Sequence, residues 1–283
     1  MLQSMTSAWF LGASFSGAPD SPYFSATFAL YLLGFLAFVL YGAVKKDGVA
    51  KTAITFLALG GVVHTVAIGI RWNAAGHIPF TNMYEYANIM AWMSVFSFLA
   101  ILRRYYRPII GLYVSPLIVV LIVSASMLPN DVHSQLVPAL QSYWLHIHVA
   151  LAAIGEGAFL VATAVSVMYL VVIRQKNRDG GVSLDTLEEI NYKALSIGYP
   201  LFTIGALFAG AIWAYEAWGS FWSWDPKEVG SLIIWLFYTL FFHGRYQRGW
   251  RGQRAAWMSV IGFVMILLSF FGNIFLGGQH AYG

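Results

Sequence analysis

The chain contains no cysteine among its 283 residues. It can therefore form no disulfide and no thiolate metal site, and any thiol in its chemistry belongs to another molecule. Charged residues are also scarce, at 10% of the chain. With 59% hydrophobic residues and a mean hydropathy of +0.67, the composition excludes an ordinary soluble domain and is typical of a polytopic membrane protein.

Lysine and arginine are absent from the first 44 positions, so this stretch lacks the basic start of a cleavable signal peptide. Of the 16 basic residues, 14 fall in four clusters between apolar runs. The clusters are Lys45, Lys46 and Lys51; Arg103, Arg104 and Arg107; Arg174, Lys176, Arg178 and Lys193; and Arg245, Arg248, Arg251 and Arg254. The positive-inside rule places all four in the cytoplasm and both termini on the extracytoplasmic side. The net charge of +4 is thus a topology signal, and we expect no nucleic-acid partner.

Eight apolar runs approach the length of about 20 residues that spans a membrane. They cover residues 23–44, 52–71, 86–102, 109–127, 145–173, 194–216, 227–243 and 255–276. The sequence predicts an all-α bundle of about eight transmembrane helices, with residues 1–283 as a single integral-membrane domain. The polar segment 177–190 is predicted to form one short interfacial helix.

Residues 213–228 read WAYEAWGSFWSWDPKE and hold four of the eleven tryptophans. The end of this stretch carries the signals of a helix N-terminus: Asp225 as N-cap, Pro226 at the first helical position and Glu228 three residues after the cap. Tryptophans at a helix end can simply anchor it at the lipid headgroups. They can also form an aromatic platform for a ligand, and both interpretations stay open at this point.

Without cysteine, any metal or haem site must use the seven histidines, alone or together with Met or carboxylates. His148 and His280 fall at the ends of two expected helices, level with the tryptophan-rich stretch. Two imidazoles beside an aromatic platform suit haem, whose commonest axial ligand is histidine. Either histidine alone could equally be bonded to water or to a carbonyl at a helix end. The sequence assigns no role to His77 or His146.

His64 and His243 lie within expected spans, where an ionisable group is a functional candidate. At 1.5 Å per residue they lie roughly 10 Å and 25 Å below the outer ends of their helices, so they do not share one iron. We expect His64 to bond a neighbouring helix. His243 either binds haem with a partner ligand from elsewhere or marks the inner boundary.

Three further residues carry charge near the candidate site. Glu156 lies two turns from His148 near the same helix face, and could assist a proton or a ligand, or could be a neutral acid bonded between helices. Arg71 and Lys227 are the only basic residues outside the four clusters. They could pair with haem propionates or simply snorkel.

Residues 218–228 resemble the tryptophan-rich WWD signature of haem-handling proteins in cytochrome c maturation. Three more stretches, 136–149, 242–250 and 277–283, narrow the resemblance to the CcsA (ResC) subunit of the system II cytochrome c synthase. It covers most of the chain from about residue 60, and residues 136–283 carry the haem-handling motifs. The family often has Thr-Trp where this chain has Val229-Gly230.

The resemblance implies specific roles for histidines. His148 and His280 would ligate haem at an external site, and His243 would ligate a transmembrane haem whose other ligand comes from the companion subunit CcsB (ResB). The haem cradle would be formed by Trp218, Trp222, Trp224, Phe221 and Asp225. Haem b would be both bound ligand and substrate.

The implied function is cytochrome c biogenesis in the bacterial cytoplasmic (inner) membrane, with the WWD loop (residues 213–228) facing the periplasm. The protein would carry haem outward and promote its thioether attachment to an apocytochrome c with a Cys-x-x-Cys-His segment. It would act as part of a holocytochrome c synthase, or haem lyase, without a side-chain nucleophile of its own. Two alternatives are a haem exporter without ligation activity and a b-type cytochrome subunit, which needs paired histidines at matched depth.

Overall fold

The computed structural model describes residues 18–175 and 182–276, with side chains to Gly272. Within these ranges the chain is helical and has no β-strand, which confirms the predicted fold class. The elements are α1 (Ser21–Val44), α2 (Asp47–Ala75), α3 (Met83–Tyr105), η1 (Pro108–Ile110), α4 (Gly111–Ser126), η2 (Pro138–Leu140), α5 (Tyr143–Arg174), α6 (Leu184–Phe202), η3 (Thr203–Ala209), α7 (Gly210–Trp218), α8 (Pro226–Arg248) and α9 (Gln253–Leu276). Because α6, η3 and α7 join without a break, these elements form eight long rods.

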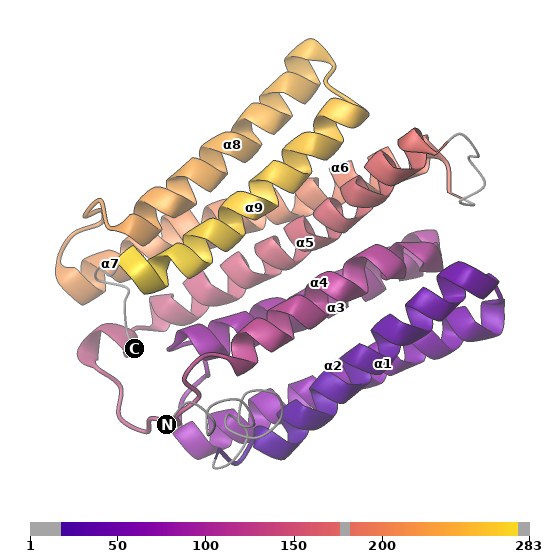
Figure 1. Cartoon of the computed structure of the whole chain (residues 1–283). Helices are drawn as coiled ribbons and strands as arrows, with labels where there is room; N and C mark the ends of the chain where they lie inside the picture. The colour runs from indigo at the N-terminus through magenta and orange to yellow at the C-terminus, as the bar shows by residue number, and fades with distance from the viewer. Residues whose placement is uncertain (1–17, 176–181, 277–283) are drawn as a thin grey trace, which may run out of the picture.

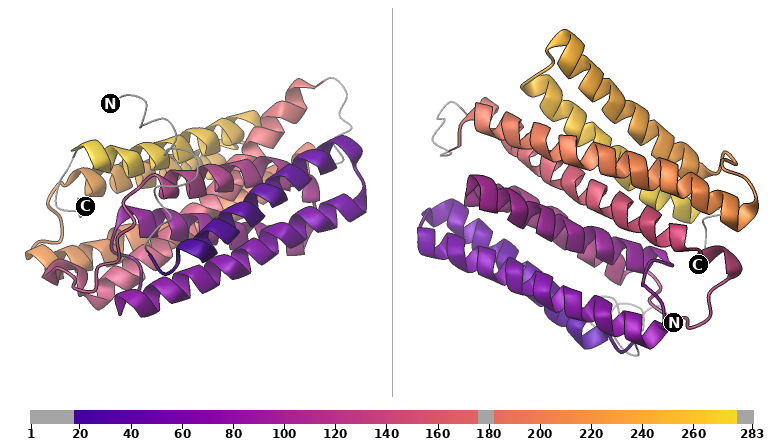
Figure 2. Two further views of the ribbon diagram at one scale, coloured as in Figure 1. Left: turned by 60° about the horizontal axis from the view of Figure 1, so that its bottom comes forward. Right: turned by 180° about the vertical axis from the view of Figure 1, so that it is seen from behind.

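The rods run up and down side by side (Figure 1). The α1–α2 pair forms one edge of the bundle and the α8–α9 pair forms the opposite edge, as the two views in Figure 2 also show. Helix α5 passes through the middle. In its apolar core 83% of the residues are buried, against 22% in α1.

Seven rods are long and apolar enough to cross a membrane: α1, α2, α3, η1–α4, α5, α6–α7 and α9. The chain is therefore an integral membrane protein. The eighth rod, α8, is less apolar than the other seven, because both of its ends carry charged residues. It packs along α9 and completes the bundle.

One predicted boundary is wrong. In its described part, from Val182 on, the polar segment 177–190 does not form a separate short helix, because Leu184 begins a rod that continues through Trp218. Ser183 caps this rod by accepting a hydrogen bond from the Thr186 N–H at 3.1 Å. No helix breaker follows before Pro200 except Gly198, so the polar turns continue directly into the apolar ones.

The connections gather at the two ends of the bundle. At one end, here called the loop end, lie the connections 76–82, 127–142 and 219–225. Hydrogen bonds hold this end together: His77 Nε2 lies 2.8 Å from the His133 carbonyl of the next connection, and Ser142 donates to Glu216 of α7. The opposite end, here called the basic end, carries the described members of the four basic clusters. There Arg245 pairs with Glu188 at 3.1 Å.

Small residues let α5 and the α6–α7 rod approach closely. A Cβ atom built on Gly155 would lie 2.9 Å from the Gly198 carbonyl oxygen, and one built on Gly198 would lie 2.8 Å from that of Gly155. Such contacts are too short for any side chain, so glycine is required at both positions. Small residues serve the same purpose in other packed membrane helices.

Candidate functional site

His148 lies on the first turns of α5, at the loop end of the bundle. Its Nδ1 is 2.9 Å from the Gly205 carbonyl oxygen. Because a carbonyl can only accept, Nδ1 carries the hydrogen, and the neutral ring keeps its lone pair on Nε2. Within the described ranges no residue forms a hydrogen bond with Nε2. That nitrogen therefore has the electronic form of a metal ligand.

The face of the His148 ring stacks on Trp213, with ring centroids 5.7 Å apart and planes 12° from parallel. Trp213 is buried, and its Nε1 donates to the Ala139 carbonyl at 2.7 Å. Trp218 also meets it edge to face, with 4.9 Å between the ring centroids. The indole of α7 thus connects His148 of α5 to the loop 127–142. Sequence analysis placed Trp213 in the aromatic stretch but did not identify this contact.

The WWD loop after α7 presents its aromatic side chains outward. Phe221 stacks on Tyr215 at 4.4 Å, and Trp222 lies perpendicular to Trp224 at 5.9 Å. Trp224 is 70% exposed and has a φ of 61°, a conformation that L side chains rarely adopt. Strained backbone of this kind clusters at ligand sites. The aromatic surface is therefore held by the fold and remains accessible.

Asp225 joins this loop to α8. It is buried, and its carboxylate accepts from the Lys227 N–H at 3.0 Å, while the Glu228 side chain accepts from the Ser223 and Asp225 N–H groups. The predicted N-cap and capping box are confirmed. The Asp225 carboxylate therefore fixes where the loop enters the helix.

Two small cavities adjoin His148, of about 50 and about 20 Å³, and Lys227 lines both. Cavities of this size have room for only a few water molecules. A larger apolar groove of about 480 Å³ lies between α8 and α9 and starts at Pro226. Gly230 lines this groove beside Ser269, at the position where the CcsA family often has Trp.

A polar cluster lies beneath His148. Glu156 is buried and accepts a hydrogen bond from the Tyr86 hydroxyl at 2.6 Å. The Lys227 ammonium lies over the Tyr86 ring, 5.4 Å from its centroid. Of the interpretations of Glu156 left open by the sequence, the structure shows the bond between helices, from α5 to α3.

The other histidines that the structure describes do not reach this site. His243 is exposed on α8 near the basic end, roughly 25 Å along the helix from Pro226. His77 bonds loop carbonyls, and His146 lies beside Phe80 at 6.3 Å. His280 lies outside the described residues, so its convergence with His148 stays a prediction.

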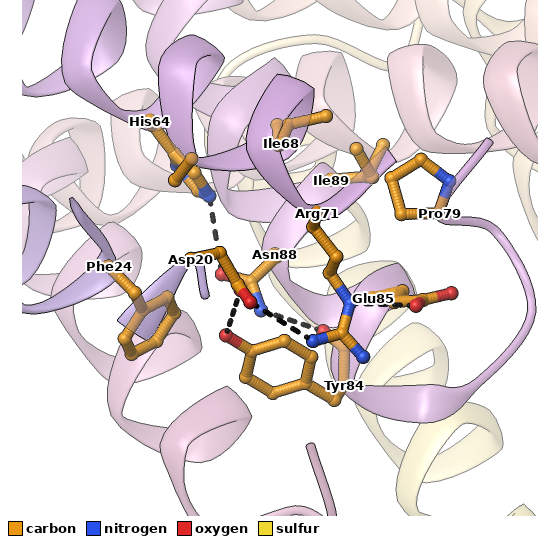
Figure 3. A pocket seen from close by; sticks show the side chains of 11 residues that line it. Asp20, Phe24, His64, Ile68, Arg71, Pro79, Tyr84, Glu85, Asn88 and Ile89 are labelled. Atoms are coloured by element: carbon orange, nitrogen blue, oxygen red, sulfur yellow. Dashed lines mark hydrogen bonds and ion pairs between the residues drawn. The ribbon is translucent and has the colours of Figure 1, made fainter. Parts of the chain in front are cut away.

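His64 bonds neighbouring helices, as predicted. Asn88 donates its amide to the Tyr84 carbonyl at 2.8 Å, so its Oδ1 accepts from His64 Nε2 at 3.2 Å. The Tyr31 hydroxyl, 3.1 Å away, then donates to Nδ1. Both ring nitrogens are therefore occupied, which leaves none for iron; Figure 3 shows the bond to Asn88. A b-type cytochrome pair that includes His64 is excluded by this arrangement.

Arg71 is committed to structure. Its guanidinium pairs with Glu85 at 2.7 Å and with Asp20 at 3.5 Å, and all three side chains are at least 96% buried (Figure 3). It also donates to the carbonyls of Asn130 and Asp131, at 3.0 and 2.8 Å. The arginine thereby ties α1, α2 and α3 to the loop 127–142. This rules out the propionate role left open for Arg71.

We expect Arg71→Met to destabilise the protein by about 3–5 kcal/mol, because two carboxylates would stay buried without their cation. Arg104→Met, an exposed change at the basic end, should have little effect. The fraction remaining monodisperse in detergent after heating, followed by size-exclusion chromatography, measures both. Equal melting curves for the two variants would contradict the structural role of Arg71.

Comparison with known proteins gives a consistent family. The model of the family described as "Cytochrome C assembly protein" matches residues 80–280. "Cytochrome c biogenesis protein CcsA" of Guillardia theta is 31% identical over 91% of this chain and 93% of its own length. The protein of the same name from Synechococcus sp. (strain CC9605) is 34% identical over 89% and 95%.

Among solved structures, "Cytochrome c Heme Lyase CcmF" superposes with a TM-score of 0.71 at 18% identity, over 89% of this chain and 46% of that protein. At this identity the likeness concerns the fold alone. The family match covers most of the chain and includes the α5 start, the WWD loop and α8. The chain therefore belongs to the cytochrome c assembly family, and within it to the CcsA proteins of cytochrome c biogenesis.

Proposed function

We propose that the chain binds haem b at the loop end of the bundle, with His148 and His280 as the axial ligands of the iron. The observation that carries the proposal is the His148 ring, stacked on Trp213 beside the WWD loop with no described partner for Nε2. Within the described ranges there is no group of three or more His, Asp or Glu side chains that could hold a metal ion by itself. Iron bound by so few protein ligands needs the four nitrogens of a porphyrin.

The WWD loop supplies the surface against which this haem packs. The exposed rings of Phe221 and Trp224, with the half-buried Trp218 and Trp222, give the aromatic area, and Asp225 holds the loop on α8. Lys227 lines both cavities beside His148, so its charge complements a propionate. Because those cavities are small, neighbouring side chains move apart when haem enters.

His243 belongs to a second haem site, whose other ligand comes from CcsB (ResB). Its exposure on α8 and its distance from the loop end support a ligand supplied by another membrane helix. The four basic clusters support a cytoplasmic basic end, with the WWD loop on the periplasmic side of the inner membrane. Haem then passes from the site at His243 to the site at His148.

The reaction adds two thiols of an apocytochrome c Cys-x-x-Cys-His segment to the two vinyl groups of haem. In each addition an S–H bond and a C=C π bond break, and a C–S bond and a C–H bond form, so no electrons are gained or lost. The thiols come from the substrate, which agrees with the absence of cysteine in this chain. The protein contributes binding and orientation.

Co-expression tests this function. With CcsB and a Cys-x-x-Cys-His apocytochrome, in a host without its own synthase, the chain should give a cytochrome whose haem stays with the polypeptide after acid-acetone extraction. A substrate with both cysteines changed to serine is the matched control and should lose its haem. A purified complex that contains haem but yields no covalent product would favour the exporter instead.

A further inference from the structure

The rod formed by α6, η3 and α7 changes from α-helix to π-helix in its middle and then back to α-helix. Residues Thr203–Ala209 form a π-helix between the α-helices α6 and α7. Pro200 lacks the N–H of a regular turn. Thr203 Oγ1 donates to the Tyr199 carbonyl at 2.7 Å, a bond that bends helices. Trp235 of α8 donates to the same hydroxyl at 3.1 Å. Such π segments are rare and occur often at functional sites.

The Gly205 carbonyl is the connection between this π segment and the site. It accepts the Gly210 N–H, the i+5 bond that defines the π turn, and it also accepts His148 Nδ1–H from α5. Both lone pairs of the oxygen are therefore used. The widened turn makes a backbone carbonyl available to a side chain of the neighbouring helix.

Glycine is required on both sides of this contact. A Cβ atom on Gly205 would lie 2.6 Å from the Ala152 nitrogen of α5, and one on Gly210 would lie 2.9 Å from His148 Nδ1. A side chain at Gly205 would push the carbonyl away from α5. A side chain at Gly210 would push the imidazole itself.

We infer that the π-helical segment Thr203–Ala209 is a positioning element, whose Gly205 carbonyl fixes the tautomer and the orientation of His148 for ligation through Nε2. A hydrogen bond from one ring nitrogen of a histidine to a carbonyl leaves the other nitrogen to bind a metal, and it raises the basicity of that nitrogen. Trp213 fixes the plane of the ring, and the carbonyl fixes its rotation in that plane. The inference rests on the proposed role of His148 as an iron ligand.

Chemical rescue of His148→Gly tests the inference in the purified complex with CcsB. Two ligands of equal size are compared: 4-methylimidazole, which keeps an N–H for the Gly205 carbonyl, and 1-methylimidazole, which lacks it. Absorbance of the bound haem gives the half-saturating concentration of each, relative to the same ligands on haem in detergent. We expect the relative half-saturating concentration of 1-methylimidazole to be on the order of tenfold higher, because this ligand leaves the buried Gly205 carbonyl without a hydrogen-bond donor.

The possible outcomes separate the two proposals. Equal relative affinities, with both ligands restoring the spectrum, would overturn the positioning role of Gly205 while supporting His148 as a ligand. A His148→Gly complex that keeps the wild-type spectrum without any added ligand would overturn the proposed function itself.

Gly210→Ala gives a second test that needs no added ligand. Its Cβ atom meets the His148 ring, and we expect a shifted haem spectrum and reduced haem retention. Gly69→Ala, on an exposed face of α2 with no atom within 4 Å of the new Cβ, is the matched control. Combined with His148→Gly, the Gly210→Ala change should leave the melting temperature unaltered, because the nearest remaining atom lies 3.7 Å away. A wild-type haem spectrum in the single variant would overturn the inference.

Discussion

Replacement of His148 by alanine should lower covalent haem attachment by more than about tenfold, since even the loss of an outer partner of a metal ligand costs 10- to 100-fold. The substitution removes the imidazole whose Nε2 is proposed to bind iron. It should spare the fold, because the ring makes one hydrogen bond and one stacking contact, with Trp213, near the start of α5. Covalent haem per folded protein, measured with CcsB and an apocytochrome, gives the result.

His146→Ala provides the matched control for this change. His146 lies two residues before His148 on α5, is half-buried, and has its ring beside Phe80, with 6.3 Å between the ring centroids. Its removal should leave attachment near the wild-type level. Attachment unaffected in His148→Ala, or equally reduced in both variants, would show that His148 does not act as a specific ligand.

Much of the fold follows from the sequence because hydropathy reports burial in lipid directly. The eight rods begin and end close to the predicted apolar runs, except at Leu184. There the polar turns gave no indication that the helix continues unbroken. The helix start at Asp225 was predictable because a capping box is a local motif.

The inner details of the site were not predictable, because they depend on contacts between helices. The sequence places His148 near the aromatic stretch, but only the packing of α5 on the η3 segment brings Gly205 to its Nδ1. Hydropathy likewise cannot show that Arg71 meets Glu85 and Asp20, which come from three different segments. From the sequence, the charge of Arg71 was therefore equally compatible with binding a haem propionate and with a structural role.

His243→Ala should separate the two proposed haem sites. The residue is exposed on α8, so alanine should be tolerated by the fold. If haem enters at the basic end and moves outward, the variant should lose the site at His243 and also contain less haem at the loop end. His280→Ala should instead keep haem at the site of His243 but attach none of it. Added imidazole should rescue each variant independently, because the two variants lose ligands of two separate proposed sites.

Haem content and absorbance of the purified complex with CcsB measure this difference. Gln247→Ala, an exposed change one turn further along α8, serves as the control and should behave as wild type. The expected order of haem content is therefore Gln247→Ala first, His280→Ala next and His243→Ala last, with covalent product only in the first. Full haem content and a wild-type spectrum in His243→Ala would mean that this histidine only marks the end of the membrane span, and that haem reaches His148 by a route that does not pass α8.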